Sequence, residues 1–162
     1  MKQKTYLAGG CFWGLEELFK QQPGVLDTEA GYTGGDTDNP TYQSHEGHAE
    51  ALEITYDDSV TSFKQLLDFF FRVHDPTTRN RQGNDIGTSY RSAIFYQSEE
   101  EREAAQTFIS LVDASGRWEH PVVTTLEPFT TFWKAEDFHQ DYLAKNPGGY
   151  TCHVIRFGSY LE

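Results

Sequence analysis

A single cysteine framed by glycines and aromatic residues is the part of the sequence best suited to chemistry. Cys11 lies within the run GGCFWG (9–14), where an apolar strand-like stretch gives way to helical spacing. At a helix start, unpaired N–H groups and the helix dipole favour a negative charge. The pKa of a thiol there falls below its ordinary value of roughly 8.5, so Cys11 is predicted to be a nucleophile. The alternative is a small apolar residue buried in the core.

The residues around Cys11 are compatible with a pocket and with plain core. Gly9 and Gly10 allow a tight turn and leave room for a ligand to approach the sulfur. Phe12 and Trp13 either belong to the apolar core, as most aromatic residues do, or form a pocket wall beside the thiol. The glycines, the aromatic pair and the helix start together favour a reactive site.

Composition indicates a globular protein. The 162 residues, 37% hydrophobic and 15% aromatic, suffice for one core, so we expect a single domain over 1–162. The net charge of −12 argues against nucleic-acid partners, which need clustered Lys and Arg. Apolar runs are too short to span a membrane. The N-terminus lacks a signal-peptide stretch, so we expect a cytoplasmic protein, although a mature form without its leader would read the same.

The second cysteine, Cys152, lies far from Cys11 in the sequence, with no Cys-x-x-Cys pair and no zinc-ligand spacing. In a reducing compartment such a pair favours catalysis over a structural disulfide. The six histidines lack the arrangement of a metal site, and the glycines of 31–35 lack the order of a phosphate-binding loop. We therefore expect no metal and no cofactor.

The hydropathy pattern predicts alternating strands and helices. Strands are expected at 6–8, 25–32, 48–56, 90–96 and 121–127, and helices between Cys11 and Pro23 and at 63–71, 98–114 and 136–145. Thr61 or Ser62 is expected to cap the second helix, and Ser98 the third. Long ordered loops are expected at 36–47 and 76–89, and 146–162 is predicted to be a flexible tail that carries Cys152.

The order β-α-β-β-α-β-α-β-α opens like the split βαβ plait. We therefore predict an α/β fold of the α+β type, a two-layer sandwich of the ferredoxin-like kind. Helices would cover one face of a mixed sheet.

Several short motifs occur in an order and spacing that chance would not produce. They are GCFWG (10–14), GYTGG (31–35), NPTY (39–42), GHAE (47–50), HDP (74–76), RQGND (81–85), GT (87–88), YRS (90–92) and GYTCH (149–153). On these motifs the chain resembles the class A peptide-methionine sulfoxide reductases over nearly its whole length. The resemblance implies reduction of the S epimer of methionine sulfoxide, in oxidised proteins or as the free amino acid.

The resemblance also implies roles for side chains. Cys11 takes the oxygen as a sulfenic acid, Glu50 donates a proton, and Tyr42 and Tyr90 hold the sulfoxide oxygen. Asp85 matches a site aspartate of the family. The alternatives are a solvated strand carboxylate for Glu50, ordinary half-buried tyrosines, and a turn-forming aspartate. Among apolar neighbours the pKa of Glu50 would rise by desolvation, which would keep it protonated.

By the same resemblance, Phe12 and Trp13 form the slot for the substrate methyl group. Cys152 condenses with the Cys11 sulfenic acid to a disulfide, and a thioredoxin reduces that disulfide. The alternative for Cys152 is an idle thiol. Nothing in the sequence requires more than a monomer.

Two other classes of protein remain open. A binding module could recognise oxidised or thioether-bearing peptides through Phe12 and Trp13 without chemistry, and it would still bind after alkylation of Cys11. A thiol peroxidase would consume hydroperoxide and leave sulfoxides untouched.

Overall fold

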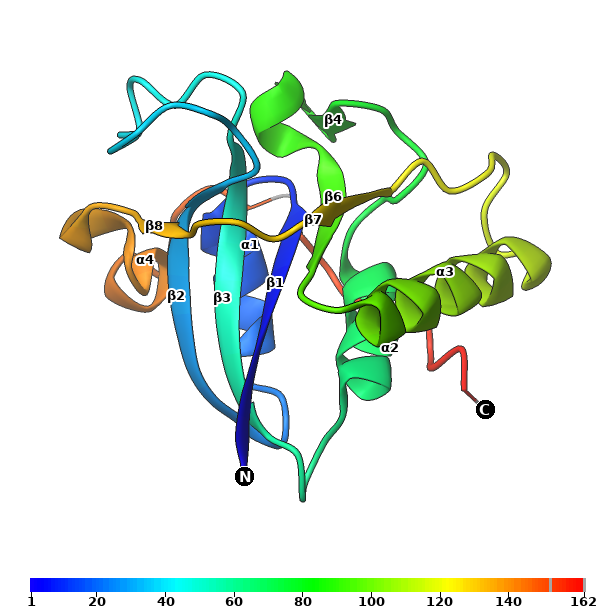
Figure 1. Cartoon of the computed structure of the whole chain (residues 1–162). Coiled ribbons are helices and arrows are strands. Elements are labelled where there is room, and N and C mark those ends of the chain that lie inside the picture. Colours follow the sequence, from blue (N-terminus) through cyan, green and yellow to red (C-terminus); the bar gives the residue numbers. More distant parts are fainter. Residues whose placement is uncertain (152, 162) are drawn as a thin grey trace.

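The structure is a computed structural model that describes residues 1–151 and 153–161, and its architecture is mixed α/β. The strands of the main sheet are β1 (Lys2–Gly9), β2 (Val25–Thr33), β3 (Ala49–Asp57), β6 (Ser92–Tyr96), β7 (Thr125–Pro128) and β8 (Trp133–Lys134). Their order is β7-β6-β1-β3-β2-β8 (Figure 1). Neighbouring strands are antiparallel except β6 and β7, which are parallel. The sheet is therefore mixed and mostly antiparallel, which confirms the predicted mixed sheet.

The remaining elements are the helices α1 (Phe12–Phe19), α2 (Phe63–Val73), α3 (Glu99–Ala114) and α4 (Tyr142–Lys145), the 3₁₀ turns η1 (Thr88–Tyr90) and η2 (Asp137–His139), and the short hairpin of β4 (Arg81–Gln82) and β5 (Asp85–Ile86). The Ser62 hydroxyl accepts a hydrogen bond from the Gln65 N–H at 3.1 Å, so Ser62 caps α2. Ser98 caps α3 in the same way through Glu101. Both caps satisfy N–H groups that a helix leaves unpaired.

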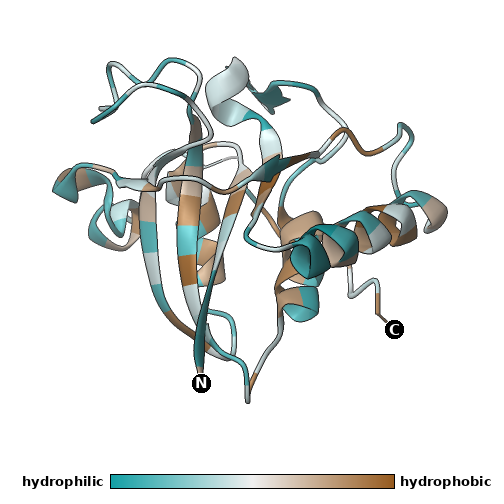
Figure 2. Ribbon diagram, viewed as in Figure 1, coloured by the Kyte–Doolittle hydropathy of each residue, from teal (hydrophilic) through white to brown (hydrophobic). Residues whose placement is uncertain are grey.

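The core lies mainly between the sheet and the helices behind it (Figures 1 and 2). Leu7 of β1 packs there with Phe12 of α1 and Phe70 of α2, all with no exposed surface. Because side chains alternate along a strand, Tyr6 and Ala8 face the opposite side of the sheet. That side is covered by the segment between β7 and β8, which crosses the front of the sheet in Figure 1; its Phe129 stacks on Tyr6 with ring centroids 3.9 Å apart.

Several predicted elements differ from the structure. The loop expected at 76–89 contains the β4–β5 hairpin, and the strand expected at 90–96 begins at Ser92, as β6. The strand expected at 121–127 begins at Thr125, as β7. The helix expected over 136–145 divides into η2 and α4, because Asp141 adopts a left-handed conformation with φ 52° that interrupts a helix.

The side chain of Gln140 explains why this segment follows the sheet edge instead of forming one helix. Its amide oxygen accepts the Ala30 N–H at 2.8 Å, and its amide nitrogen donates to the carbonyls of Ala30 at 2.8 Å and Ala135 at 3.0 Å. The side chain thus takes up the backbone groups that β2 leaves open beyond its short pairing with β8. Strand β8 has two residues, too few for a hydropathy pattern to indicate it.

The last described residues of the chain lie against α2. The Arg156 N–H donates to the Arg72 carbonyl at 2.8 Å, and the Tyr160 N–H donates to the Asp68 carboxylate at 2.7 Å. Tyr160 is buried in the core beside α2. This part of the chain has no regular secondary structure, and its flexibility stays a prediction. None of the helices in the described ranges is both long and apolar enough to cross a membrane.

Candidate active site

Cys11 lies where β1 ends and α1 begins, and it is the N-cap residue of α1. The predicted position at a helix N-terminus is therefore confirmed. Gly10 has φ +93°, in the left-handed region that glycine adopts without strain, and this conformation turns the chain from the strand into the helix. Cys11 is buried, with 7% of its surface exposed.

Glu50 of β3 lies beside the first turn of α1. Its Oε1 atom accepts the N–H of Phe12, the residue after Cys11, at 3.2 Å. Its Oε2 atom is buried and has no hydrogen-bond partner among the residues that the structure describes. The carboxyl is 1% exposed, which excludes a solvated strand carboxylate.

The pKa of Glu50 is raised to about 8. Burial is the main cause, the hydrogen bond from Phe12 opposes it, and the negative charge of Asp85 adds to it. At neutral pH the carboxyl is therefore largely protonated. It can donate a proton to a group brought beside Cys11.

Tyr42 and Tyr90 face the same site. Burial raises the pKa of each phenol, and negative charge at Glu50 is the next cause for both. Charge at Cys11 raises both further, so the two phenols and the thiol are close enough to interact. An interaction with the Tyr90 hydroxyl opposes these effects and lowers the pKa of Tyr42.

His45 joins the loop of Tyr42 to the turn η1 that carries Tyr90. Its Nδ1 atom donates to the Thr41 carbonyl at 2.8 Å, which leaves Nε2 to accept the Ser89 hydroxyl at 2.7 Å. His45 therefore connects the two segments that carry the phenols. Within the described ranges, no group of three or more His, Cys, Asp or Glu side chains is placed to hold a metal ion.

Asp85 lies in β5 and is half-buried. Its carboxylate accepts a hydrogen bond from the Tyr150 hydroxyl at 3.3 Å. Its charge raises the pKa of Glu50, so it belongs to the electrostatic surroundings of the site. Asp85 pairs with Gln82 in the β4–β5 hairpin.

The aromatic residues after Cys11 differ in position. Phe12 has no exposed surface and packs in the core against Tyr32 and His139. Trp13 is partly exposed, donates its indole N–H to His139 Nδ1 at 2.9 Å and stacks on Tyr142 with centroids 3.8 Å apart. Trp13 can therefore present a ring face to a ligand, whereas Phe12 lies beneath.

Several residues of the site could not be recognised in the sequence. Glu136 accepts the Tyr32 hydroxyl at 2.9 Å and the backbone N–H of Tyr42 at 3.0 Å. Burial raises the pKa of Glu136, but these hydrogen bonds outweigh burial and the pKa is lowered. An ionised Glu136 thus anchors the loop of Tyr42. It follows Tyr42 by more than 90 residues, and no motif includes it.

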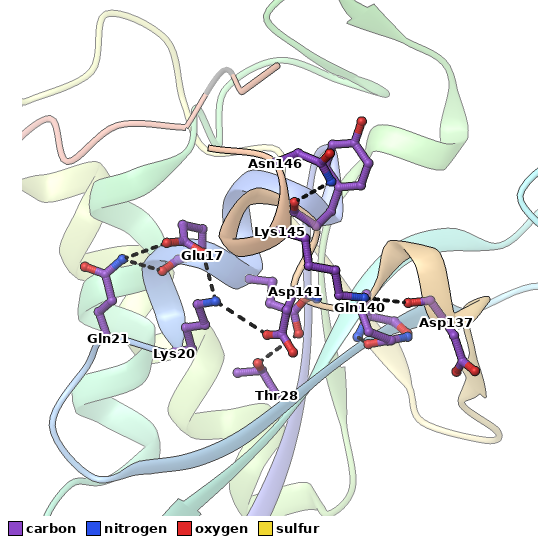
Figure 3. Close-up of polar contacts among 12 residues, drawn as sticks. Glu17, Lys20, Gln21, Thr28, Asp137, Gln140, Asp141, Lys145 and Asn146 are labelled. Atoms are coloured by element: carbon purple, nitrogen blue, oxygen red, sulfur yellow. Dashed lines mark hydrogen bonds and ion pairs between the residues drawn. The ribbon is translucent and has the colours of Figure 1, made fainter. Parts of the chain in front are cut away.

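Glu16 of α1 holds the segment that carries His139 and Tyr142. Glu16 is buried, and its carboxylate accepts the Thr28 hydroxyl at 2.9 Å and the Asp141 N–H at 2.8 Å. Nearby, Lys20 lies 3.5 Å from the Asp141 carboxylate (Figure 3). These contacts, together with those of Gln140, fasten the segment after β8 to α1 and β2.

The structure therefore brings Cys11, Glu50, Tyr42, Tyr90 and Asp85 together and places Trp13 beside them. Cys152 lies outside the described residues. A thiol at a helix N-terminus, a protonated carboxyl and a pair of phenols, carried by an α/β fold, are the groups that an enzyme needs for thiol chemistry on a substrate that must be protonated.

Comparisons with known proteins give the family. The sequence model of the family described as peptide methionine sulfoxide reductase matches residues 3–159. The peptide methionine sulfoxide reductase MsrA of Mycolicibacterium gilvum is 59% identical over 156 residues, which are 96% of this chain and 92% of that protein. The chain belongs to the peptide methionine sulfoxide reductase family, and it is an oxidoreductase of the MsrA type.

Solved structures of a yeast protein, Mxr1, resemble this chain in fold. Mxr1 from Saccharomyces cerevisiae in reduced form has a TM-score of 0.87 and 36% identity, covering 96% of this chain and 93% of that one. The same yeast protein in complex with Trx2 has a TM-score of 0.68 and 27% identity, covering 96% and 91%.

Proposed function

We propose that this enzyme reduces the S epimer of methionine sulfoxide, in proteins and as the free amino acid, with Cys11 as nucleophile and Glu50 as acid. The observation that carries the proposal is the buried Glu50 carboxyl beside the first turn of α1, with its pKa raised to about 8. A sulfoxide oxygen must gain protons before its bond to sulfur can break. A carboxyl that is protonated at neutral pH supplies one.

In the first step, the Tyr42 and Tyr90 hydroxyls donate hydrogen bonds to the sulfoxide oxygen and stabilise the charge that develops on it. The Cys11 thiolate reacts at the activated sulfoxide while Glu50 gives its proton to the oxygen. The oxygen is transferred to Cys11, which becomes a sulfenic acid, and methionine leaves. Cys11 is oxidised by two electrons and the substrate sulfur is reduced by two.

The methyl group of the substrate lies against Trp13, with Phe12 beneath it. Aromatic rings bind methyl and sulfur groups well, and a slot that accepts methyl but not oxygen selects one epimer. The hydrogen bond to His139 and the stacking on Tyr142 support this role, because they hold the Trp13 ring in one orientation.

In the second step, the Cys152 thiol attacks the Cys11 sulfenic acid. A disulfide forms and the oxygen leaves as water. A thioredoxin dithiol then reduces the disulfide by exchange, and the yeast relative solved in complex with Trx2 supports a partner of this kind.

Further proposals concern the domain organisation, the oligomeric state, the location and the topology of the protein. We infer one domain over 1–162 acting as a monomer in the cytoplasm, with 146–162 as its tail. We also infer that β1, α1, β2, β3, α2 and β6 form the split βαβ plait, since the order β6-β1-β3-β2 with antiparallel neighbours suits it.

The proposal is tested by a thiol count without reductant. Incubated with methionine S-sulfoxide, the enzyme should form about one methionine per chain and lose both thiols, because each turnover oxidises one pair. Methionine formation with both thiols intact would rule out this mechanism. Cys11→Ser should form no methionine, whereas Cys152→Ser should form about one equivalent and stop at the sulfenic acid.

A further inference from the structure

The residues on either side of Cys152 pack against the residues on either side of Cys11. His153 is 4% exposed, and its Nε2 atom lies 2.6 Å from the carbonyl oxygen of Gly9, the last residue of β1. A carbonyl oxygen only accepts, so Nε2 carries the proton and donates it. The two residues are 144 positions apart in the sequence, and this bond joins the C-terminal segment to the strand end that leads into Cys11.

Gly14 makes the space for this contact. A Cβ atom at Gly14 would lie 2.5 Å from His153 Nδ1 and would collide with the Thr151 hydroxyl. A Cβ at Gly10 would instead collide with the Gln82 side chain, 2.6 Å away, and would be in ordinary contact with His153. The His153 N–H in turn donates to the Thr151 hydroxyl at 3.1 Å, which ties the two docked residues together.

We propose that His153 is a positioning residue for the second step. Its hydrogen bond to Gly9, together with its close packing on Gly14, would hold the C-terminal segment so that the Cys152 thiol meets the Cys11 sulfenic acid. The inference rests on the proposed function, because it assigns a task only if Cys152 resolves that sulfenic acid.

The physical reason is the narrow geometry of a disulfide. Its Cα atoms are separated by roughly 4.4 to 6.8 Å, and a chain segment with many accessible conformations seldom meets that requirement. Fixing the segment raises the effective concentration of one thiol near the other. The first step requires no such positioning, since it involves the substrate and the groups around Cys11.

A second buried histidine, His74, lies near the contact between His153 and Gly9. His74 is also fully buried beside Gly9 and interacts with His153, and Arg156 faces both. His74 Nδ1 donates to the Phe70 carbonyl at 2.6 Å and its Nε2 accepts the Ser92 hydroxyl at 2.7 Å, so it is tied to α2 and β6. His153 alone of these side chains is bonded to the strand end at Gly9.

The test separates the two steps in single-turnover experiments without reductant. For His153→Leu, methionine should form at the wild-type rate. Loss of the second thiol should slow by about threefold to tenfold, as expected when one hydrogen bond of ordinary net strength is lost. The sulfenic acid should accumulate and be trapped by a dione reagent. His153→Gln, which keeps an N–H donor at similar reach, should restore most of the rate.

Two further variants keep the test decisive. Val154→Ala, at an exposed tail position, is the matched control and should behave like the wild type. Alanine has a higher helix propensity than glycine, but the added Cβ of Gly14→Ala would occupy the space of Thr151 and His153. This variant should therefore also slow the second step. It decides the outcome if His153→Leu fails to fold.

The outcomes are distinguishable. Second-step rates equal to the wild type in His153→Leu, or in Gly14→Ala if that variant decides, would overturn the positioning role while the proposed function stands. A wild-type enzyme that forms methionine without losing thiols would overturn the proposed function itself.

Discussion

At the residue scale, the site depends on one carboxyl kept neutral by burial. Among the residues that the structure describes, only Phe12 donates a hydrogen bond to Glu50, which is too little to compensate a buried negative charge. The same desolvation raises the pKa of the nearby phenols of Tyr42 and Tyr90. At neutral pH the site therefore offers a proton and two hydroxyl donors to a polar oxygen brought beside Cys11.

Replacing Glu50 by Gln should slow methionine formation in the first turnover by about 10²-fold to 10⁴-fold, the usual contribution of a general acid. The amide still accepts the Phe12 N–H but has no proton to give. Rapid quench of a single turnover measures the rate. The control is Glu53→Gln on the same strand, whose carboxylate binds Lys4 and Tyr6 away from the site. A wild-type rate in Glu50→Gln would show that the acid is another group.

The pH dependence of the first turnover should report the same group. Because the pKa of Glu50 is about 8, its protonated fraction falls above that pH, and the wild-type rate should decline there. Glu50→Gln should lack this decline. Single-turnover rates of both proteins, measured by rapid quench from pH 6 to pH 9.5, provide the comparison. Identical pH profiles would contradict the assignment.

At the element scale, the first turn of α1 is positioned by what contacts the helix further along. Glu16 connects α1 to Thr28 of β2 and to Asp141, and the segment after β8 brings His139 and Tyr142 to Trp13. Among the described residues Glu16 accepts two hydrogen bonds, whereas Glu50 accepts one. Burial raises the pKa of Glu16 as well, and the hydrogen bonds from Asp141 and Thr28 oppose that rise.

Glu16→Ala should lower the free energy of unfolding by about 1 to 3 kcal/mol, because it leaves the Thr28 hydroxyl and the Asp141 N–H without their buried acceptor. Glu17→Ala is the matched control. Glu17 forms a surface ion pair with Lys20, so its loss should change stability by less than about 1 kcal/mol. Denaturant unfolding of the three proteins measures this, and equal losses in both variants would contradict the role of Glu16.

At the scale of the whole molecule, two buried histidines make stability depend on acid. Burial lowers the pKa of His74 to about 3 and that of His153 to about 4, although each donates a hydrogen bond to a carbonyl. The unfolded chain binds protons on both near their ordinary pKa of about 6.5, and the folded chain does not. Stability from these groups is therefore present above that pH and is lost as the pH falls toward 4 and 3.

Comparison with His74→Gln isolates one of them. Between pH 6.5 and pH 4 the wild type should lose stability relative to this variant at up to about 1.4 kcal/mol per pH unit. Unfolding by denaturant at a series of pH values gives the difference directly. Glu50 has the opposite effect: because its pKa is raised to about 8, the protein loses stability from this group as the pH rises from the ordinary range of a glutamate to 8. Both proteins contain Glu50, so its contribution cancels when their stabilities are subtracted. A constant difference would mean that His74 is protonated in the folded protein.

The sequence by itself determined the features that local chemistry fixes. The break at Gly10 before α1 and the caps at Ser62 and Ser98 follow from backbone preference and from side chains that satisfy nearby N–H groups. The position of Cys11 at the helix start follows from the same local rules. The motifs also predicted the family, because they occur in the family's order along the chain.

Tertiary structure alone decided what depends on contacts between distant segments. It broke the helix expected at 136–145, because Gln140 and Glu16 bind groups of β2 and Asp141 that no local pattern reveals. It also decided that Glu50 is neutral, because a pKa is set by burial and by neighbouring charges, and both exist only once β3, α1 and the hairpin of Asp85 have come together.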